Sequence, residues 1–186
     1  MTRLRIATGL LVLASALPLA AGTLPRQNPF APRPRPEHAL LKKLAGKWTA
    51  DFEMTMTGAP IKSRASEVNE MLGELWIVSR YEDPGMMGGA FRGAQLFGYD
   101  PDEKKYVGAW ADSQSANLSV QKGTYDEATR TLTLVGTSKD PMTGADSTVR
   151  TVMTWTDDDH RSQRMFVPGP GGKEMELFTI EYEREK

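Results

Sequence analysis

The sequence contains no cysteine among its 186 residues. This absence excludes disulfide bonds, thiol nucleophiles, CxxC redox chemistry and cysteine-based zinc sites. It also excludes a lipid anchor attached through an N-terminal cysteine. A protein exported without disulfides must rely on packing and on backbone hydrogen bonds. A closed sheet provides both, because it has no unpaired edge.

The main part of the chain has no excess of basic charge. Five of the 23 Lys and Arg residues lie in the first 36 positions, where there is no acidic residue. The rest of the chain therefore has 18 basic side chains against all 24 acidic ones. This balance argues against nucleic acid as a partner, because phosphate binding needs a basic face.

Histidine is scarce, and only His38 and His160 could act as general bases or haem ligands. His160 follows three aspartates at 157–159, so a Ser-His-Asp arrangement can be drawn, but a solvated turn explains the same residues. No HExxH motif occurs, and the three aspartates lack the spacing of a calcium loop. The glycine-rich residues 169–172 lie between two strands and are interpreted as a hairpin tip. We therefore rank an enzyme last and expect neither a metal nor a cofactor.

Residues 1–22 have the features of a secretory signal peptide. Arg3 and Arg5 form a positive start, an apolar run follows, and small residues predict cleavage after Ala21 or Gly22. The alternative is an uncleaved membrane anchor, although glycine and proline interrupt the apolar run. We expect a periplasmic or secreted protein with no membrane span after cleavage.

A linker and a short helix precede the main domain. Residues 23–36 contain five prolines and too little apolar content to pack, so we interpret them as an extended spacer. Residues 37–45 carry three leucines on one edge and are followed by Gly46, which suits a helix end. We place the folded domain at residues 37–186.

This domain alternates between strand-like segments and polar turns. The clearest example is residues 96–110, where two aromatic and apolar runs flank Asp100, Pro101 and Asp102. From Trp48 onward, apolar and polar residues alternate with the period of two that a half-buried strand requires. The pattern predicts about ten strands, at residues 48–56, 61–72, 75–82, 91–99, 105–112, 117–125, 131–137, 146–156, 160–167 and 173–183.

Closure of these strands into a ring is the simplest arrangement. No intervening segment is long enough for a crossover helix, so the connections are antiparallel and mostly join neighbours. Ten meandering strands left open would expose two long edges. We therefore predict an all-β fold, an antiparallel up-and-down β-barrel with a short N-terminal helix. Barrels of this strand number can enclose a ligand-sized space.

Polar residues interleaved with aromatic ones mark a candidate ligand site. Trp110 and Asp112 share one face of a strand. If that face is interior, Asp112 needs a cationic partner, which Arg80 or Arg150 could supply, because an unpaired buried charge is costly. The alternative is a set of charge ladders on the outer surface. The candidate ligand-binding residues are Arg80, Tyr81, Gln95, Trp110, Asp112 and Arg150.

Three features together resemble the lipocalin-like, or calycin, barrels. They are a short helix ending in Gly46-x-Trp48, a meander of about ten strands, and the basic Arg184 after the last strand. In such barrels the tryptophan plugs the closed end and a late arginine packs over its ring. The resemblance implies that Trp48 and Arg184 form a structural pair, since a cation over an indole contributes about 0.5–2 kcal/mol.

Several motifs are similar to those of an exported bacterial family of barrels described only as a domain of unknown function. This resemblance covers roughly residues 37–186 and implies the fold and export but no activity. A haem barrel of the nitrobindin kind is also similar in outline, but it needs a proximal histidine, and neither His38 nor His160 has an inward-facing context. The motifs are Gly98-Tyr99-Asp100, Tyr106-Val107-Gly108-x-Trp110-x-Asp112-Ser113, Gly123-Thr124-Tyr125-Asp126 and Asp140-Pro141-Met142-Thr143-Gly144.

The sequence leaves two main functional hypotheses. The preferred one is an exported barrel that holds a small apolar or amphipathic ligand between aromatic walls, with one or two polar anchors. The other is an interaction or structural module of the cell envelope, whose partner is an envelope protein or a second copy of the chain. That module would show an apolar patch on its outer wall or at the loop of Met86 and Met87. Methionine suits adaptable apolar surfaces, although an ordinary loop could also place both side chains on the core.

Overall fold

The computed structural model describes residues 32–54, 59–139 and 144–186. The predicted signal peptide, most of the proline-rich spacer, the last two residues of the predicted strand 48–56 and most of the motif at 140–144 lie outside these residues. The folded part is one compact unit, Arg33–Lys186. Within the described residues, no helix has both the length and the apolar character needed to cross a membrane.

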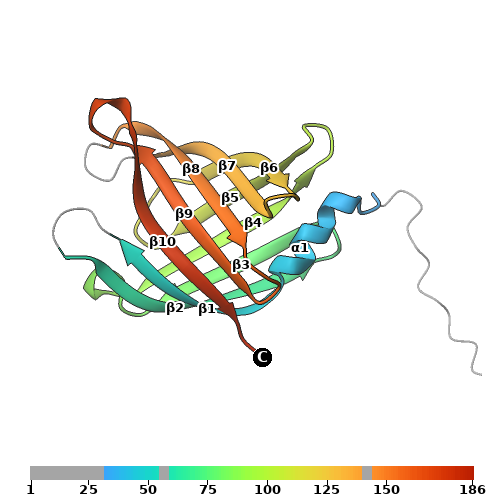
Figure 1. Ribbon diagram of the computed structural model, residues 1–186, viewed down its shortest axis with the longest axis horizontal. Helices are drawn as coiled ribbons and strands as arrows, with labels where there is room; N and C mark the ends of the chain where they lie inside the picture. The colour runs from blue at the N-terminus through green and yellow to red at the C-terminus, as the bar shows by residue number, and fades with distance from the viewer. Residues whose placement is uncertain (1–31, 55–58, 140–143) are drawn as a thin grey trace, which may run out of the picture. The chain divides into compact units, whose positions relative to one another are not determined.

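Ten strands of the described residues form a closed antiparallel barrel (Figure 1). Each strand pairs with its neighbours in sequence, and the first pairs with the last. This confirms the predicted up-and-down barrel with a short N-terminal helix. The helical elements are η1 (Pro36–His38), α1 (Ala39–Leu44), η2 (Met86–Gly88) and η3 (Pro170–Gly172). The strands are β1 (Gly46–Met54), β2 (Ile61–Leu72), β3 (Trp76–Asp83), β4 (Phe91–Asp100), β5 (Lys105–Asp112), β6 (Ser119–Asp126), β7 (Thr131–Lys139), β8 (Asp146–Trp155), β9 (His160–Pro168) and β10 (Glu174–Arg184).

The predicted helix over residues 37–45 is divided in the structure. Pro36 opens the 3-10 turn η1, and α1 continues it for one and a half turns before Ala45 becomes extended. Gly46, expected to stop the helix, is the first residue of β1 and has a φ of +121°. A Cβ at this position would lie 2.8 Å from Nη1 of Arg184. Glycine is therefore required both by the backbone angle and by the arginine packed against it.

The hairpin of β4 and β5 forms as the turn residues predict. Oδ1 of Asp100 accepts hydrogen bonds from the backbone N–H groups of Asp102, at 2.9 Å, and Glu103, at 3.1 Å. Lys104 completes the turn with a φ of +52°. The side chain of Asp100 thus accepts hydrogen bonds from two backbone N–H groups that have no backbone acceptor within the turn.

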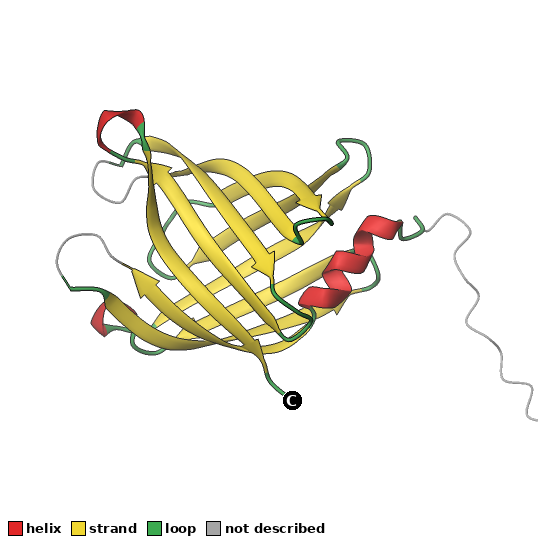
Figure 2. Cartoon of the chain, viewed as in Figure 1, coloured by secondary structure: helices red, strands yellow, loops and turns green. Residues whose placement is uncertain are grey.

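The two ends of the barrel differ. At one end, called here the closed end, α1 lies across the strands (Figure 1). The opposite end, called here the mouth, carries the single turns η2 and η3 (Figure 2). Leucines 40, 41 and 44 of α1 pack against inward-facing side chains and form a continuous core at the closed end with Ile77, Phe97, Tyr99, Tyr106, Leu132, Leu134, Met153 and Trp155.

Candidate functional site

The inner face of the barrel has a packed half and an accessible half. Near the closed end, the inward-facing Ile77 and Leu132 are fully buried. Gln95, Gln121 and Gln163 also face inward, from the middle of β4, β6 and β9, but they are partly exposed. A side chain that faces inward from the middle of a strand meets solvent only through the lumen. Solvent therefore reaches the middle of the lumen beside these three strands, whereas the inward-facing Phe52 of β1 and Tyr81 of β3 are buried.

Aromatic side chains line one wall of this open half. The rings of Tyr81 and Phe91 meet edge to face with centroids 6.0 Å apart, and Phe91 stacks on Trp110 at 6.4 Å. The indole of Trp110 lies over Gly93, where an added Cβ would be 2.1 Å from the ring. Gly93 thus provides the slot in which the Trp110 ring lies.

Two carboxylates stand beside this aromatic wall. Asp112 accepts hydrogen bonds from Nε1 of Trp110, at 3.0 Å, and from the backbone N–H of Gln114, at 2.9 Å. Asp83 is buried, and accepts from the hydroxyl of Ser63 and from the backbone N–H of Gly85. These bonds satisfy the carboxylate oxygens in part and leave the negative charges unneutralised.

A buried ion pair forms the floor of the open half. Arg161, which is 1% exposed, donates from Nη2 to Oε1 of Glu67 at 2.5 Å. Its guanidinium lies 3.5 Å from the centroid of the Tyr182 ring, and Asn69 donates to the same Glu67 oxygen at 2.6 Å. Burial raises the pKa of Tyr182, and the negative charge of Glu67 raises it further. The floor is thus a compact polar network with a neutral phenol and one balanced charge pair.

Trp48 closes the barrel between two arginines. Arg161 lies inside, 4.9 Å from the Trp48 ring centroid, and Arg184 covers the ring at 4.1 Å. Nε1 of Trp48 donates to the carbonyl of Leu44 at 2.8 Å. Arg184 also donates to the carbonyl of Ala45 at 2.6 Å and thereby ties the last strand to the end of α1. Trp48 and Arg184 are therefore in contact as the resemblance implies, with Arg161 as a further member.

The six predicted ligand-binding residues do not lie together. Tyr81, Gln95, Trp110 and Asp112 face the lumen, but Arg80 and Arg150 lie on the outer wall. Arg80 pairs with Glu70 at 2.7 Å, and Arg150 pairs with Glu174 at 2.6 Å and packs over the Phe166 ring. Their positions follow from the alternation of β3 and β8, which places Tyr81 and Thr151 inside and their neighbours outside. The expected partnership of either arginine with Asp112 does not form; Trp110 takes that place.

Neither histidine lies in the open half of the lumen. His38 is buried in η1, where Nδ1 accepts the backbone N–H of Arg35 at 3.0 Å and the ring meets Tyr99 edge to face. His160 is exposed and bonds Asp157 at 2.8 Å within its turn. Met86 is buried against the core, and of Met87 only the backbone is described. The residues that face the open half therefore offer no imidazole to a haem.

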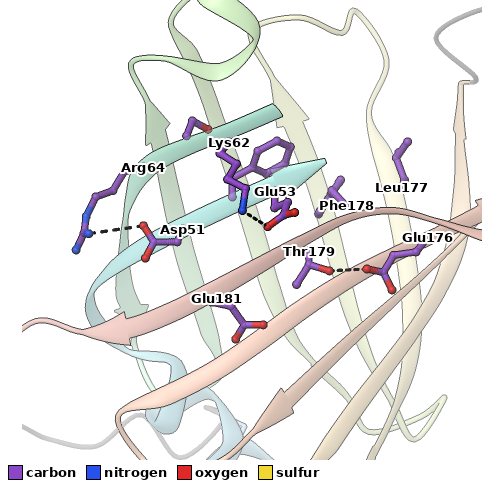
Figure 3. Close-up of a pocket in the computed structure, with 11 residues that line it drawn as sticks. Asp51, Glu53, Lys62, Arg64, Glu176, Leu177, Phe178, Thr179 and Glu181 are labelled. Atoms are coloured by element: carbon purple, nitrogen blue, oxygen red, sulfur yellow. Dashed lines mark hydrogen bonds and ion pairs between the residues drawn. The ribbon is translucent and has the colours of Figure 1, made fainter. Parts of the chain in front are cut away.

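A hollow also lies over β1, β2 and β10, and its lining combines charged side chains of the outer face with the inward-facing Phe52, Ser63 and Phe178 (Figure 3). It is a groove of about 750 Å³, and its charged side chains largely pair with one another. Lys62 bonds Glu53 at 2.9 Å, and Arg64 lies 3.7 Å from Asp51 (Figure 3). Paired, exposed charges of this kind contribute little to recognition. The open half of the lumen is the better candidate site.

Sequence reasoning missed several residues that build this site, among them Phe91 of the aromatic wall. Arg161 and Glu67 are 94 positions apart, so no local pattern joins them. Glu67 does fall on the alternation of β2 that buries Ala65 and Asn69, and this was the available signal. Asp83 lies just beyond the predicted strand 75–82, and Gly93 carries no chemical group that marks it.

Arg161→Met tests the buried network. We expect a loss of about 3–5 kcal/mol in the free energy of unfolding, because the change leaves the Glu67 charge buried without its partner. Urea denaturation followed by tryptophan fluorescence measures it. The matched control is Arg64→Met, which removes an exposed pair and should cost less than about 1 kcal/mol. Equal effects of the two changes would contradict this account.

Comparison with known proteins agrees with the fold. The profile of a family described as "Protein of unknown function (DUF1579)" matches residues 33–184. The search among curated proteins gave no match. The crystal structure of Rv2717c from M. tuberculosis is similar to this chain with a TM-score of 0.62 and 12% identity, over 82% of this chain and 99% of that one. At that identity the likeness shows the barrel fold alone. The family match spans nearly all of the folded unit, and the chain belongs to the DUF1579 family.

Proposed function

We propose that this protein is a binding barrel that holds a small apolar or amphipathic molecule in the mouth half of its lumen. The observation that carries the proposal is the partial exposure of Gln95, Gln121 and Gln163, which face inward from the middle of their strands. A barrel packed along its whole length would bury all three. Ligand sites are typically concave and apolar with a few placed polar groups, and the aromatic wall and glutamines of this lumen fit that description.

The partly exposed rings of Phe91 and Trp110 would provide most of the contact area, and the buried Tyr81 supports Phe91 from behind. Aromatic side chains carry large apolar surfaces and lose little conformational freedom when they bind. Inward-facing Met54 and Phe178 pack against the same cluster. Methionine adapts to irregular shapes. This lining therefore suits apolar molecules of different shapes better than it suits one particular molecule.

Gly93→Ala tests the lumen as the binding site. The added Cβ would displace the Trp110 ring, so we expect weaker binding of a neutral fluorescent lipophile such as N-phenyl-1-naphthylamine, by about tenfold. Gly89→Ala is the matched control, because no atom lies within 4 Å of the added carbon. Fluorescence titration measures both. A wild-type barrel that binds no lipophile, and is empty by native mass spectrometry, would end the proposal.

We also propose that the barrel acts outside the cytoplasm, in the periplasm or as a secreted protein. The support is the sequence of residues 1–22, with its basic start, apolar run and small residues. Intact-mass measurement of protein from the extracytoplasmic fraction should give a mature chain that begins just after Ala21 or Gly22. A full-length chain confined to the cytoplasm would contradict this location.

A second candidate function is self-association through the outer wall. Val78, Leu96, Ala109 and Val120 are paired in a row across β3, β4, β5 and β6 on the outer face. Leu96 and Val120 are 43% and 45% exposed. The row carries no charge, so two copies could face each other without opposing like charges. This supports a second copy of the chain as the partner.

Leu96→Lys tests this surface. If the row is a dimer contact, a charge at its centre should convert the dimer to a monomer, because an unpaired buried charge is costly. Sedimentation velocity measures the change. Met175→Lys is the control, since Met175 is 38% exposed and lies on β10, which pairs with no strand of the row. A wild-type protein that is monomeric at high concentration would remove this candidate.

A further inference from the structure

Inside the barrel, negative charges outnumber positive ones toward the mouth. Apart from Arg184, which covers the closed end, the inward-facing strand positions of the described residues carry one cation and three carboxylates. The cation, Arg161, is held by Glu67 at the floor. The described residues offer no ion-pair partner to the other two carboxylates. The four charged residues are Glu67, Asp83, Asp112 and Arg161.

The two unneutralised carboxylates flank the same strand. Asp83 of β3 is paired in register with Phe91, and Asp112 of β5 is paired with Gly93. They therefore stand on either side of the aromatic wall. The described loops next to them, 84–90 and 113–118, contain no charged residue. The mouth thus combines aromatic faces with negative potential.

Tyr81 adds an unused polar atom at this place. The residue is 3% exposed, and its hydroxyl has no hydrogen-bond partner within the described part of the chain. Burial raises its pKa, and the charges of Asp83 and Glu67 raise it further, so the phenol is neutral. A neutral phenol beside carboxylates offers its oxygen as an acceptor. A buried polar atom without a partner is costly, and a bound donor would relieve that cost.

We propose that the mouth binds an amphipathic amine in its protonated form. The ammonium would lie against Asp112 and the faces of Trp110 and Phe91, where carboxylate charge and the aromatic quadrupole both attract a cation. The Tyr81 oxygen would accept a hydrogen bond from the ammonium. The negative charge of Asp83, on the other side of β4, would add to the attraction. The apolar body would extend along the open lumen. This inference rests on the proposed binding function and names the chemical class that the site selects.

Three probes of equal chain length test the charge preference on the wild-type protein: decylammonium, decanol and decanoate. Isothermal titration at neutral pH and low salt should give the tightest binding for decylammonium and the weakest for decanoate, with at least tenfold between the two. Rising salt should weaken decylammonium binding and leave decanol unchanged. Equal affinity for all three, or a preference for decanoate, would overturn the inference and leave the binding function standing. Binding of none would overturn both.

Neutralising Asp112 tests where the bound ammonium lies. Asp112→Asn keeps an acceptor for Trp110 and removes the charge, so we expect about a tenfold loss of decylammonium affinity with decanol unchanged. Asp51→Asn is the matched control, because Asp51 lies on the outer wall and pairs with Arg64. Retained decanol binding establishes that the variant is folded. Full decylammonium affinity in Asp112→Asn would contradict the assigned position of the cation.

Discussion

Hydrogen bonding between β1 and β10 joins the two ends of the folded unit and turns a meander of strands into a ring. The register sets Trp48 opposite Arg184, Ala50 opposite Tyr182 and Phe52 opposite Ile180. An inside and an outside exist only because this pairing forms. It also brings the late strands β9 and β10 to the first one, so that Arg161 and Arg184 reach the two sides of Trp48. In a chain without cysteine, this closure takes the place of a covalent link between distant segments.

The closed end of the barrel is fully packed, which leaves the mouth half as the place for the proposed ligand. The three leucines of α1 and the network around Arg161 provide buried contacts at that end, and a second buried cluster with Phe52, Tyr81 and Met86 packs part of the mouth half. The open half does not need to be filled to hold the strands together, because the backbone ladders continue past it. The proposed ligand can therefore occupy the solvent-reached part of the lumen without displacing the packed side chains that stabilise the barrel.

The chemistry of the lumen follows from glycine positions as much as from polar ones. Gly93 gives Trp110 the room to lie flat against the wall, and the ring then directs Nε1 to Asp112. The charge of Asp112 is thereby kept at the aromatic surface and is not neutralised by an arginine. Arg80 and Arg150 are held on the outer wall by Glu70 and Glu174. The interior keeps a net negative charge while the outer wall stays nearly balanced by its own pairs.

The sequence alone determined the strands, their antiparallel order and the ring, because the period of two and the turn residues are local signals that act over a few positions. It also determined that Trp110 and Asp112 share a face, since alternation fixes that within one strand. It could not decide which face is interior for β3 and β8, so Arg80 and Arg150 could not be separated from the residues of the lumen. Nor could it join Glu67 to Arg161, which meet only when the ring closes. Tertiary structure decided these points because charged residues in a barrel pair across strands. Which residues meet depends on the strand register and on the space that neighbouring side chains leave.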